Sequence, residues 1–263
     1  MKILAFGDVM GRVGREGISK VLPELRQELK PDTVIINIEN MAHGKGISPD
    51  TMTEALAWEA DCYTTGDHAW DNELGLAILE DKKIPIVRPA NYPKGAIGRG
   101  WHVFSSGAWQ VAVINMQGQL GFRNTPENPF TYIDELLTIP EIAQAHIRLI
   151  DFHAEFTSEK RGFGWHVDGR VSGVWGTHTH IPTADAQVLP EGTGYISDVG
   201  MCGAYDSVIG MEKSGPLNMF KTQMKPKFSP PDEGVAEIGA VLFDIEPKDG
   251  KTTRVEHIRR IVE

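Results

Sequence analysis

The sequence is poor in cysteine, in long apolar runs and in positive charge. Its 263 residues include only two cysteines, Cys62 and Cys202, which are too few for a disulfide framework and form no Cys-x-x-Cys zinc pattern. No apolar run is long enough to span a bilayer, and residues 1–6 are too short for the core of a signal peptide. We therefore expect a cytoplasmic protein with no membrane contact.

The charge balance excludes one broad class of partner. The formal net charge of −10 argues against extensive binding to a nucleic-acid backbone, because like charges repel. It does not exclude a phosphate substrate, since bound cations create a local positive site on an acidic protein. Internal repeats, low-complexity tracts and a clean linker are all missing, so we expect one domain over residues 1–263.

Strand and helix patterns alternate in the first half of the chain. Lys2–Phe6 and Thr33–Ile38 are typical of buried strands, and the spacing of apolar residues predicts a helix from about Arg15 to Leu29. Pro23 lies inside that helix and predicts a kink or a break. Residues 84–87 resemble an edge strand because they contain a proline. The last third is rich in strands. Together these patterns favour a layered α/β fold whose sheets are flanked by helices.

Polar side chains follow five of the predicted strands. One aspartate after a strand is more often a helix cap or a turn residue, and one His-x-His pair is more often incidental. Five strand ends in one chain, each with carboxylate, amide or imidazole groups, favour a shared site, because ligands bind at the carboxyl ends of strands in α/β sheets. The residues concerned are Asp8, Glu39, Asn40, Asp67, His68, His153, His178 and His180.

The donor chemistry narrows the kind of site. The candidate ligands offer oxygen and nitrogen and no thiolate, which suits Mn, Fe, Zn, Ni or Co. The seven candidate ligands, which are the residues above without His68, are too many for one tetrahedral zinc ion. They suit two ions about 3.5–4 Å apart, the arrangement used for in-line displacement at phosphorus. Glu39 is the best candidate for a bridging carboxylate, because Asn40 beside it can serve one of the ions.

Taken together, the motifs resemble those of a known superfamily. They are Gly-Asp at 7–8, Glu-Asn at 39–40, Gly-Asp-His at 66–68, Asp-Phe-His-Ala-Glu at 151–155 and Gly-Thr-His-Thr-His at 176–180. This set resembles the calcineurin-like metallophosphoesterases, and most closely their bacterial YmdB-type cyclic-nucleotide phosphodiesterase branch. The likeness covers nearly the whole chain.

The resemblance implies a fold, cofactors and partners. The fold is a four-layer sandwich of two mixed β-sheets flanked by helices. The cofactors are two divalent or mixed-valence metal ions, with Fe or Mn first and Zn, Co or Ni as alternatives. The substrate is a small phosphodiester such as a 2',3'- or 3',5'-cyclic nucleotide, including cyclic phosphates derived from RNA. The resemblance also implies a homodimer or homotetramer.

Carried over by position, the resemblance assigns each ligand. One metal takes Asp8, Glu39, Asn40 and His180, and the other takes Glu39, Asp67, His153 and His178. His68 lies beside both ions without binding either. Two positions depart from the wider pattern. Asp8 is followed by Val9 and Met10 where the superfamily has Asp-x-His, a loss expected in this branch. Asp67 stands where the family usually has Asn, and it adds one negative charge.

The expected mechanism is attack on phosphorus by a hydroxide held between the ions, with His68 as the general acid that protonates the leaving ribose oxygen. The alternative role for His68 is to orient a neighbouring ligand. Asp71 and Glu155 are candidates to orient His68 or His153, and Asp198 is expected to support the site by hydrogen bonds. Rival functions are a phosphomonoesterase or nuclease on the same site, or a regulatory protein with structural metals.

Two further residues lie outside these motifs. For Lys160, a solvated surface charge is favoured over a phosphate contact. Phe122, in the irregular segment 116–129, is the aromatic residue most worth testing, since so long a loop suggests a lid.

Overall fold

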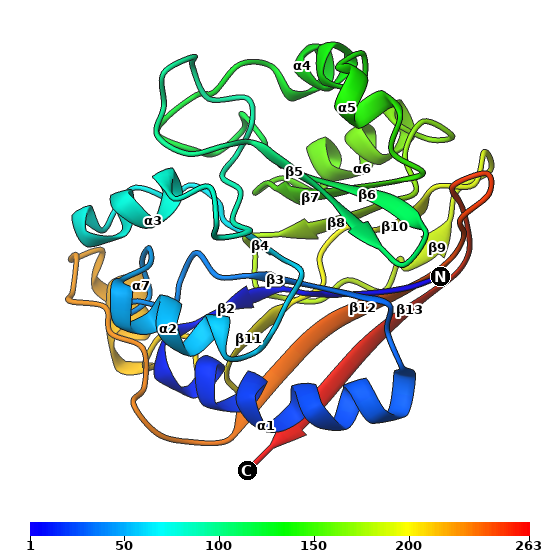
Figure 1. The fold of residues 1–263 in the computed structure, drawn as a ribbon. Coiled ribbons are helices and arrows are strands. Elements are labelled where there is room, and N and C mark those ends of the chain that lie inside the picture. Colours follow the sequence, from blue (N-terminus) through cyan, green and yellow to red (C-terminus); the bar gives the residue numbers. More distant parts are fainter.

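Two mixed β-sheets pack face to face, with helices on both outer surfaces, in a computed structural model that describes residues 1–263 (Figure 1). The four-layer α/β sandwich expected from the sequence is therefore confirmed. The seven-stranded sheet has the order β2 (Asp8–Val9), β11 (Met201–Ala204), β12 (Ala236–Glu246), β1 (Lys2–Phe6), β3 (Thr33–Asn37) and β4 (Cys62–Thr64), with β13 (Lys251–Val262) antiparallel to β12.

The second sheet has six strands. Its order is β5 (Trp101–Ser106), β6 (Trp109–Gln117), β7 (Ile147–His153), β8 (Gly173–Thr177), β10 (Gly194–Ile196) and β9 (Gln187–Val188). The central strands β6, β7, β8 and β10 are parallel, and the two edge strands are antiparallel to their neighbours. Parallel strands need both faces covered, and their continuous apolar sequences reflect this.

Helices cover the outer face of each sheet. The helices of the chain are α1 (Gly11–Leu29), α2 (Pro49–Leu56), the short 3₁₀ helix η1 (Glu73–Gly75), α3 (Leu76–Glu80), α4 (Pro129–Leu136), α5 (Pro140–Ala143), α6 (Thr157–His166) and α7 (Ser214–Thr222). Helix α1 packs on the seven-stranded sheet, and α4 to α6 lie over the six-stranded sheet (Figure 1). None of the helices combines the length and apolar character needed to cross a bilayer.

Three apolar clusters fill the spaces between these layers. The largest joins α1 and α2 to the seven-stranded sheet, and a second joins α4 and α6 to the six-stranded sheet. The third lies between the two sheets, where Ile35, Val113 and Trp175 are fully buried. This third cluster fixes the two sheets relative to one another and so fixes the strand ends that carry the polar residues.

Two expectations about local structure are revised. Helix α1 starts earlier than expected, at Gly11, and continues through Pro23 as one element. Pro23 faces solvent, so the carbonyl that loses its donor is open to water. Residues 84–87 form no regular strand, since Ile86 makes only an isolated parallel bridge to Tyr63. Pro85, inside this short stretch, has no N–H to donate and so limits its ladder of hydrogen bonds.

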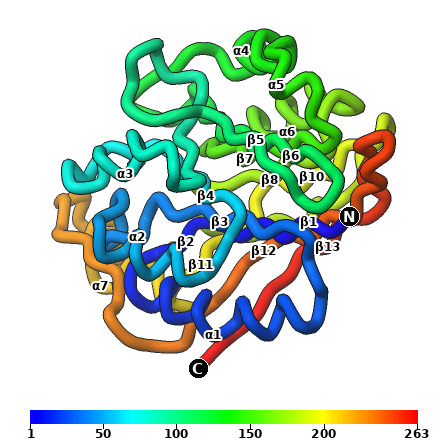
Figure 2. The backbone as a smooth tube through the Cα atoms, in the orientation of Figure 1, coloured from blue at the N-terminus to red at the C-terminus, as the bar shows by residue number.

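The course of the chain explains how distant motifs meet. Figure 2 shows that the blue N-terminal part forms the lower layers, the green middle forms the upper layers, and the orange and red C-terminal part returns to the lower ones. Strands β3, β4, β7 and β8 all end on the same side of the molecule (Figure 1). The loops that leave these strands are therefore brought together.

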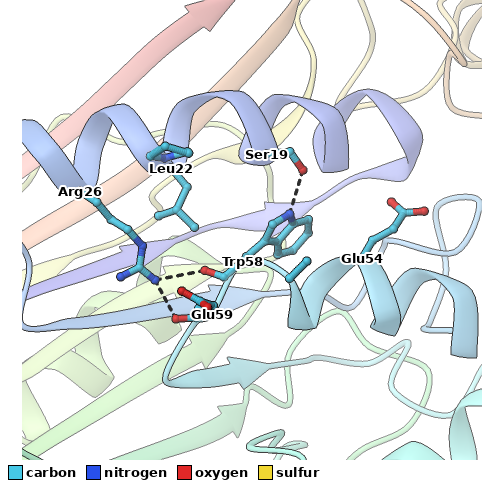
Figure 3. A pocket seen from close by; sticks show the side chains of 8 residues that line it. Ser19, Leu22, Arg26, Glu54, Trp58 and Glu59 are labelled. Atoms are coloured by element: carbon cyan, nitrogen blue, oxygen red, sulfur yellow. Dashed lines mark hydrogen bonds between the residues drawn. The ribbon is translucent and has the colours of Figure 1, made fainter.

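A separate cavity lies between α1 and the end of α2 (Figure 3). Arg26 donates hydrogen bonds to the carbonyls of Trp58 and Glu59, and the Trp58 indole donates to Ser19 Oγ at 2.9 Å. These contacts tie the two helices together. None of the residues that line this cavity is a candidate metal ligand.

Candidate metal centre

All seven predicted ligands lie in one region: Asp8 is in β2, His153 ends β7, and the other five follow β3, β4 and β8. Four of them form a compact group in which one donor atom of each lies within 4.8 Å of the others. This group consists of Glu39, Asp67, His153 and His178. We call it the first half-site, and we call Asp8, Asn40 and His180 the second half-site.

Donor atoms in the first half-site lie almost in contact. His153 Nε2 is 3.1 Å from Asp67 Oδ1 and 3.2 Å from Glu39 Oε1. His178 Nδ1 is 3.0 Å from His153 Nε2 and 3.4 Å from Asp67 Oδ1. Two ligands on one ion at about 2.1 Å are separated by about 3.0–3.4 Å in octahedral or tetrahedral geometry. The observed spacings match the edges of such a coordination shell.

The second half-site joins the first through Asp8. Its Oδ2 accepts a hydrogen bond from the His178 main-chain nitrogen at 3.1 Å. Its Oδ1 lies 3.8 Å from His153 Nδ1 and 3.9 Å from His180 Nε2. Asn40 donates from Nδ2 to the Gly44 carbonyl, which leaves its Oδ1 free. The three side chains of this half-site therefore present two oxygens and one imidazole nitrogen.

A cation fits this arrangement. Asp8 Oδ1 and Asn40 Oδ1 are buried oxygens with no hydrogen-bond partner, a costly state that a cation relieves. The backbone also leaves space for the donors at Gly66. A Cβ atom there would lie 2.1 Å from Glu39 Oε2 and 2.4 Å from His153 Nε2, so only glycine is compatible with the site.

Each histidine is held through the ring nitrogen that does not face the site. His180 Nδ1 lies 2.8 Å from the Ile209 carbonyl, which only accepts, so the proton sits on Nδ1 and Nε2 is free. His178 Nε2 lies 3.1 Å from a Glu155 carboxylate oxygen, which leaves Nδ1 free. His153 Nδ1 lies 2.9 Å from Thr177 Oγ1. Such contacts are typical of metal-binding histidines. Glu155 thus orients His178 rather than the expected His68 or His153.

The two histidines after β8 have unusual backbone conformations. His178 has φ of 90° and His180 has φ of 65°, both in the region that favours glycine. Residues in such conformations cluster at functional sites because the surrounding structure must hold them there. Here the conformation directs both rings towards the same group of carboxylates.

A buried ion pair supports this turn. Lys160 Nζ lies 2.6 Å from Asp198 Oδ2 and donates to the Thr177 carbonyl at 2.8 Å. Asp198 also accepts from the Thr179 hydroxyl at 2.7 Å. Asp198 therefore supports the site as expected. Lys160 is only 1% exposed, so the expectation of a solvated surface charge is wrong. Lys160 is the fourth residue of α6, and the weak amphipathic pattern of this helix did not indicate its burial.

The charges of the site balance one another in the metal-free protein. Burial lowers the pKa of His153, but the carboxylates of Glu39, Asp67 and Asp8 outweigh burial and hold that pKa well above its usual range. Burial raises the pKa of Asp67, but His153, His68 and His178 outweigh it and lower that pKa overall. Burial and the neighbouring His153 lower the pKa of His178 to about 2. A proton on His153 therefore neutralises part of the negative charge.

His68 lies at the edge of this group. Its main-chain nitrogen donates to Glu39 Oε2 at 3.3 Å, and its Nδ1 lies 2.8 Å from Asp71 Oδ2. With Nδ1–H donated to the Asp71 carboxylate, Nε2 is available for proton transfer. Asp71 was one of two candidates to orient His68, and it does contact this ring. Phe122 also lies at the site, with its ring centroid 4.7 Å from that of His178.

The residues beneath the ligands have a role that no sequence pattern predicted, although Asp151 and Thr177 lie within two of the motifs. Asn37, Thr64, Asp151 and Thr177 form a buried polar network between the two sheets. Burial raises the pKa of Asp151 to about 7, against the opposing hydrogen bonds from Thr177 and Thr64. The available signal was a polar residue at a position where strand alternation predicts burial.

The chain matches the family described as YmdB-like protein over residues 4–258. It belongs to that family. The resemblance inferred from the motifs is therefore confirmed. Over 259 residues the chain is 41% identical to the 2',3'-cyclic-nucleotide 2'-phosphodiesterase of Bacillus subtilis, covering 98% of this chain and 96% of the relative.

Solved structures agree with this assignment. A crystal structure described as a novel phosphatase from Mycoplasma pneumoniae superposes with a TM-score of 0.93 at 32% identity, covering 100% of this chain and 94% of that one. The Haemophilus influenzae NAD nucleotidase shares the fold at a TM-score of 0.60 and 14% identity, covering 100% of this chain and 56% of that one. The YmdB-like chain thus has the fold of the metallophosphoesterases.

Proposed function

We propose that this YmdB-like protein is a metal-dependent phosphodiesterase that hydrolyses 2',3'-cyclic nucleotides. The observation that carries the proposal is the meeting of four donor residues within 4.8 Å, next to two buried oxygens without partners. The B. subtilis relative, which is named for hydrolysis of 2',3'-cyclic nucleotides at the 2' position, supports the substrate. Both half-sites draw on both sheets, which supports a single domain.

We infer the division of ligands that the family resemblance implied. Glu39, Asp67, His153 and His178 would hold one ion, and Asp8, Asn40, His180 and Glu39 would hold the other. When bound, the cations supply Lewis-acid activation of the phosphate and of the attacking water. Oxygen and nitrogen donors with three imidazoles favour Fe or Mn, with Zn, Co or Ni as alternatives.

His68 acts on the leaving group. With Nδ1–H donated to Asp71, a second proton on Nε2 is directed to the ribose oxygen as the P–O bond breaks. Cleavage of the 2' ester leaves the phosphate on the 3' oxygen. Phe122 covers the rings of His153 and His178 and so limits the access of water to that side of the site.

We also propose a cytoplasmic enzyme that assembles as a homodimer or homotetramer. Cys62 and Cys202 are both buried free thiols, as a reducing compartment allows. Cyclic phosphates at the ends of RNA fragments share the chemistry of the mononucleotide and are included among the candidate substrates.

The test combines elemental analysis with a phosphoester panel on the purified protein. The proposal predicts two metal ions per chain and hydrolysis of 2',3'-cyclic AMP to 3'-AMP with Mn²⁺ added. Faster hydrolysis of mono- than of bis-p-nitrophenyl phosphate indicates a phosphomonoesterase instead. A metal-loaded protein that is inert towards every phosphoester indicates a regulatory protein.

A further inference from the structure

The side chain of Asp151 lies directly beneath the metal centre, between the two sheets. Asp151 is in β7 and is fully buried. Its Oδ1 accepts from Thr177 Oγ1 at 2.6 Å, and its Oδ2 accepts from Asn37 Nδ2 at 3.0 Å and from the Thr64 hydroxyl. Three donors from three other strands therefore converge on one carboxylate.

These strands belong to different sheets. Asn37 ends β3 and Thr64 ends β4 in the seven-stranded sheet, whereas Asp151 and Thr177 lie in β7 and β8 of the six-stranded sheet. A carboxylate that accepts from both sheets fixes the distance between them at this point. The surrounding contacts between the sheets are apolar. Apolar contacts have no preferred direction, whereas these hydrogen bonds fix the relative positions of the strands.

Two of these donors, Asn37 and Thr177, also contact a proposed ligand. Asn37 Oδ1 accepts from the Glu39 main-chain nitrogen at 3.1 Å. Asn37 Nδ2 also donates to the carbonyl of Thr65, two residues before Asp67, at 3.3 Å. Thr177 immediately precedes His178, and its hydroxyl oxygen lies 2.9 Å from His153 Nδ1. The network therefore contacts Glu39 and His153 by hydrogen bonds and adjoins His178 along the chain.

The hydroxyl of Thr177 also settles the orientation of the His153 ring. Thr177 donates its single hydroxyl hydrogen to Asp151 Oδ1 at 2.6 Å. The Thr177 oxygen must then accept from His153 Nδ1–H, which leaves Nε2 directed at Glu39 and Asp67. Contacts of this kind behind a metal ligand raise its affinity for the ion.

We infer that Asp151 and Thr177 are positioning residues that align the first half-site across the two sheets and hold His153 with Nε2 free for a cation. The inference rests on the metal centre proposed above. It adds that affinity for the ion depends on a carboxylate that never touches it.

The test is a Co²⁺ titration followed by visible absorption, with competition against a chelator. Thr177→Val keeps the shape of the side chain and removes the hydroxyl, so affinity for the first half-site should fall about tenfold to a hundredfold. Thr177→Ser restores the hydroxyl and should bind within twofold of the unmodified protein. Thr252→Val is the matched control, because Thr252 is also buried and donates to a backbone carbonyl, that of Ser172, at 2.6 Å.

Asp151→Asn extends the test to the carboxylate. The amide places a donor against Asn37 and Thr64, so affinity should again fall, and the double variant with Thr177→Val should show less than the sum of the two losses. Should Asp151→Asn fail to fold, Thr177→Val and Thr177→Ser decide the matter alone. A folded Thr177→Val that binds Co²⁺ like the unmodified protein or like Thr252→Val overturns the inference. An unmodified protein that binds no Co²⁺ overturns the proposed function instead.

Discussion

In the first half-site four pairs of donor atoms lie 3.0–3.4 Å apart, whereas in the second Asp8 Oδ1 and Asn40 Oδ1 have no hydrogen-bond partner. The first is neutralised by a proton on His153, whose pKa the surrounding carboxylates raise. The second relies on backbone contacts, with Ile209 and Gly44 carbonyls holding His180 and Asn40. Both half-sites are already formed in the metal-free protein, but different interactions stabilise them there.

This difference shows how one chain prepares two sites without a cation. A proton replaces the ion where carboxylates and imidazoles are crowded together. In the second half-site Asp8 Oδ1 and Asn40 Oδ1 are buried without a partner and burial raises the pKa of Asp8, an unfavourable state that a bound ion relieves. The half-sites should therefore respond differently to mutation, to pH and to metal.

The largest effect is expected from His178→Ala. The variant removes one donor of the first half-site and the main contact between Glu155 and the site. Lewis-acid activation is worth several kcal/mol, so kcat/KM for 2',3'-cyclic AMP should fall on the order of 10³-fold. His146→Ala is the control, because this exposed histidine lies outside the site. Equal activity in the two variants would contradict the ligand role of His178.

A smaller loss is expected from His68→Ala, because the His68 ring approaches the first half-site only at Asp67, with Nδ1 3.8 Å from Asp67 Oδ2. Both metals should remain bound, while turnover falls about 10²- to 10⁴-fold because the general acid is lost. The loss should shrink for bis-p-nitrophenyl phosphate, whose leaving group needs no proton. Metal content by elemental analysis and kcat on both substrates check this. Loss of metal from the variant would indicate an orienting role instead.

The two half-sites should also differ in their response to pH. The raised pKa of His153 gives the metal-free protein stability that is fully present below the usual histidine pKa of about 6.5 and is lost as pH rises through the raised value. A cation displaces this proton, so binding at the first half-site should release about one proton per ion at pH 7 and strengthen as pH rises.

Calorimetric titration in two buffers of different ionisation enthalpy measures the released proton. Thermal unfolding with and without chelator, from pH 6 to pH 9, should show a widening difference in Tm. Binding that releases no proton would contradict the charge balance proposed for this half-site.

The smallest effect is expected from Asp67→Asn, which restores the residue usual in the wider family. Removal of one negative charge should weaken metal binding about tenfold or less. It should also move the acid limb of the pH–rate profile to lower pH, since fewer negative charges remain to hold a proton near the metals. If metal affinity and the pH–rate profile are both unchanged, the extra carboxylate has no functional role.

The sequence predicted the fold and gathered the candidate ligands because both depend on short-range patterns. Continuous apolar runs mark parallel strands, and polar residues after them fall at one edge of a sheet. Side-chain contacts between the two packed sheets follow no such short-range pattern. The carboxylate of Asp151 meets Asn37 and Thr64 across more than 80 residues of chain, so its role emerged only from the structure.

The predictions for Lys160 and for Pro23 failed for the same physical reason. Lys160 belongs to a helix with weak amphipathic character, and its burial depends on Asp198, which lies 38 residues later. Pro23 suggested a break in α1, but the apolar face on the seven-stranded sheet holds the helix together on both sides of it. Tertiary packing decided both cases.

The most direct test of the two-cation site is anomalous diffraction from crystals grown with Mn²⁺. The account predicts two peaks about 3.5–4 Å apart. One should lie among Glu39, Asp67, His153 and His178, and the other among Glu39, Asp8, Asn40 and His180. A single peak, or peaks away from these residues, would contradict it.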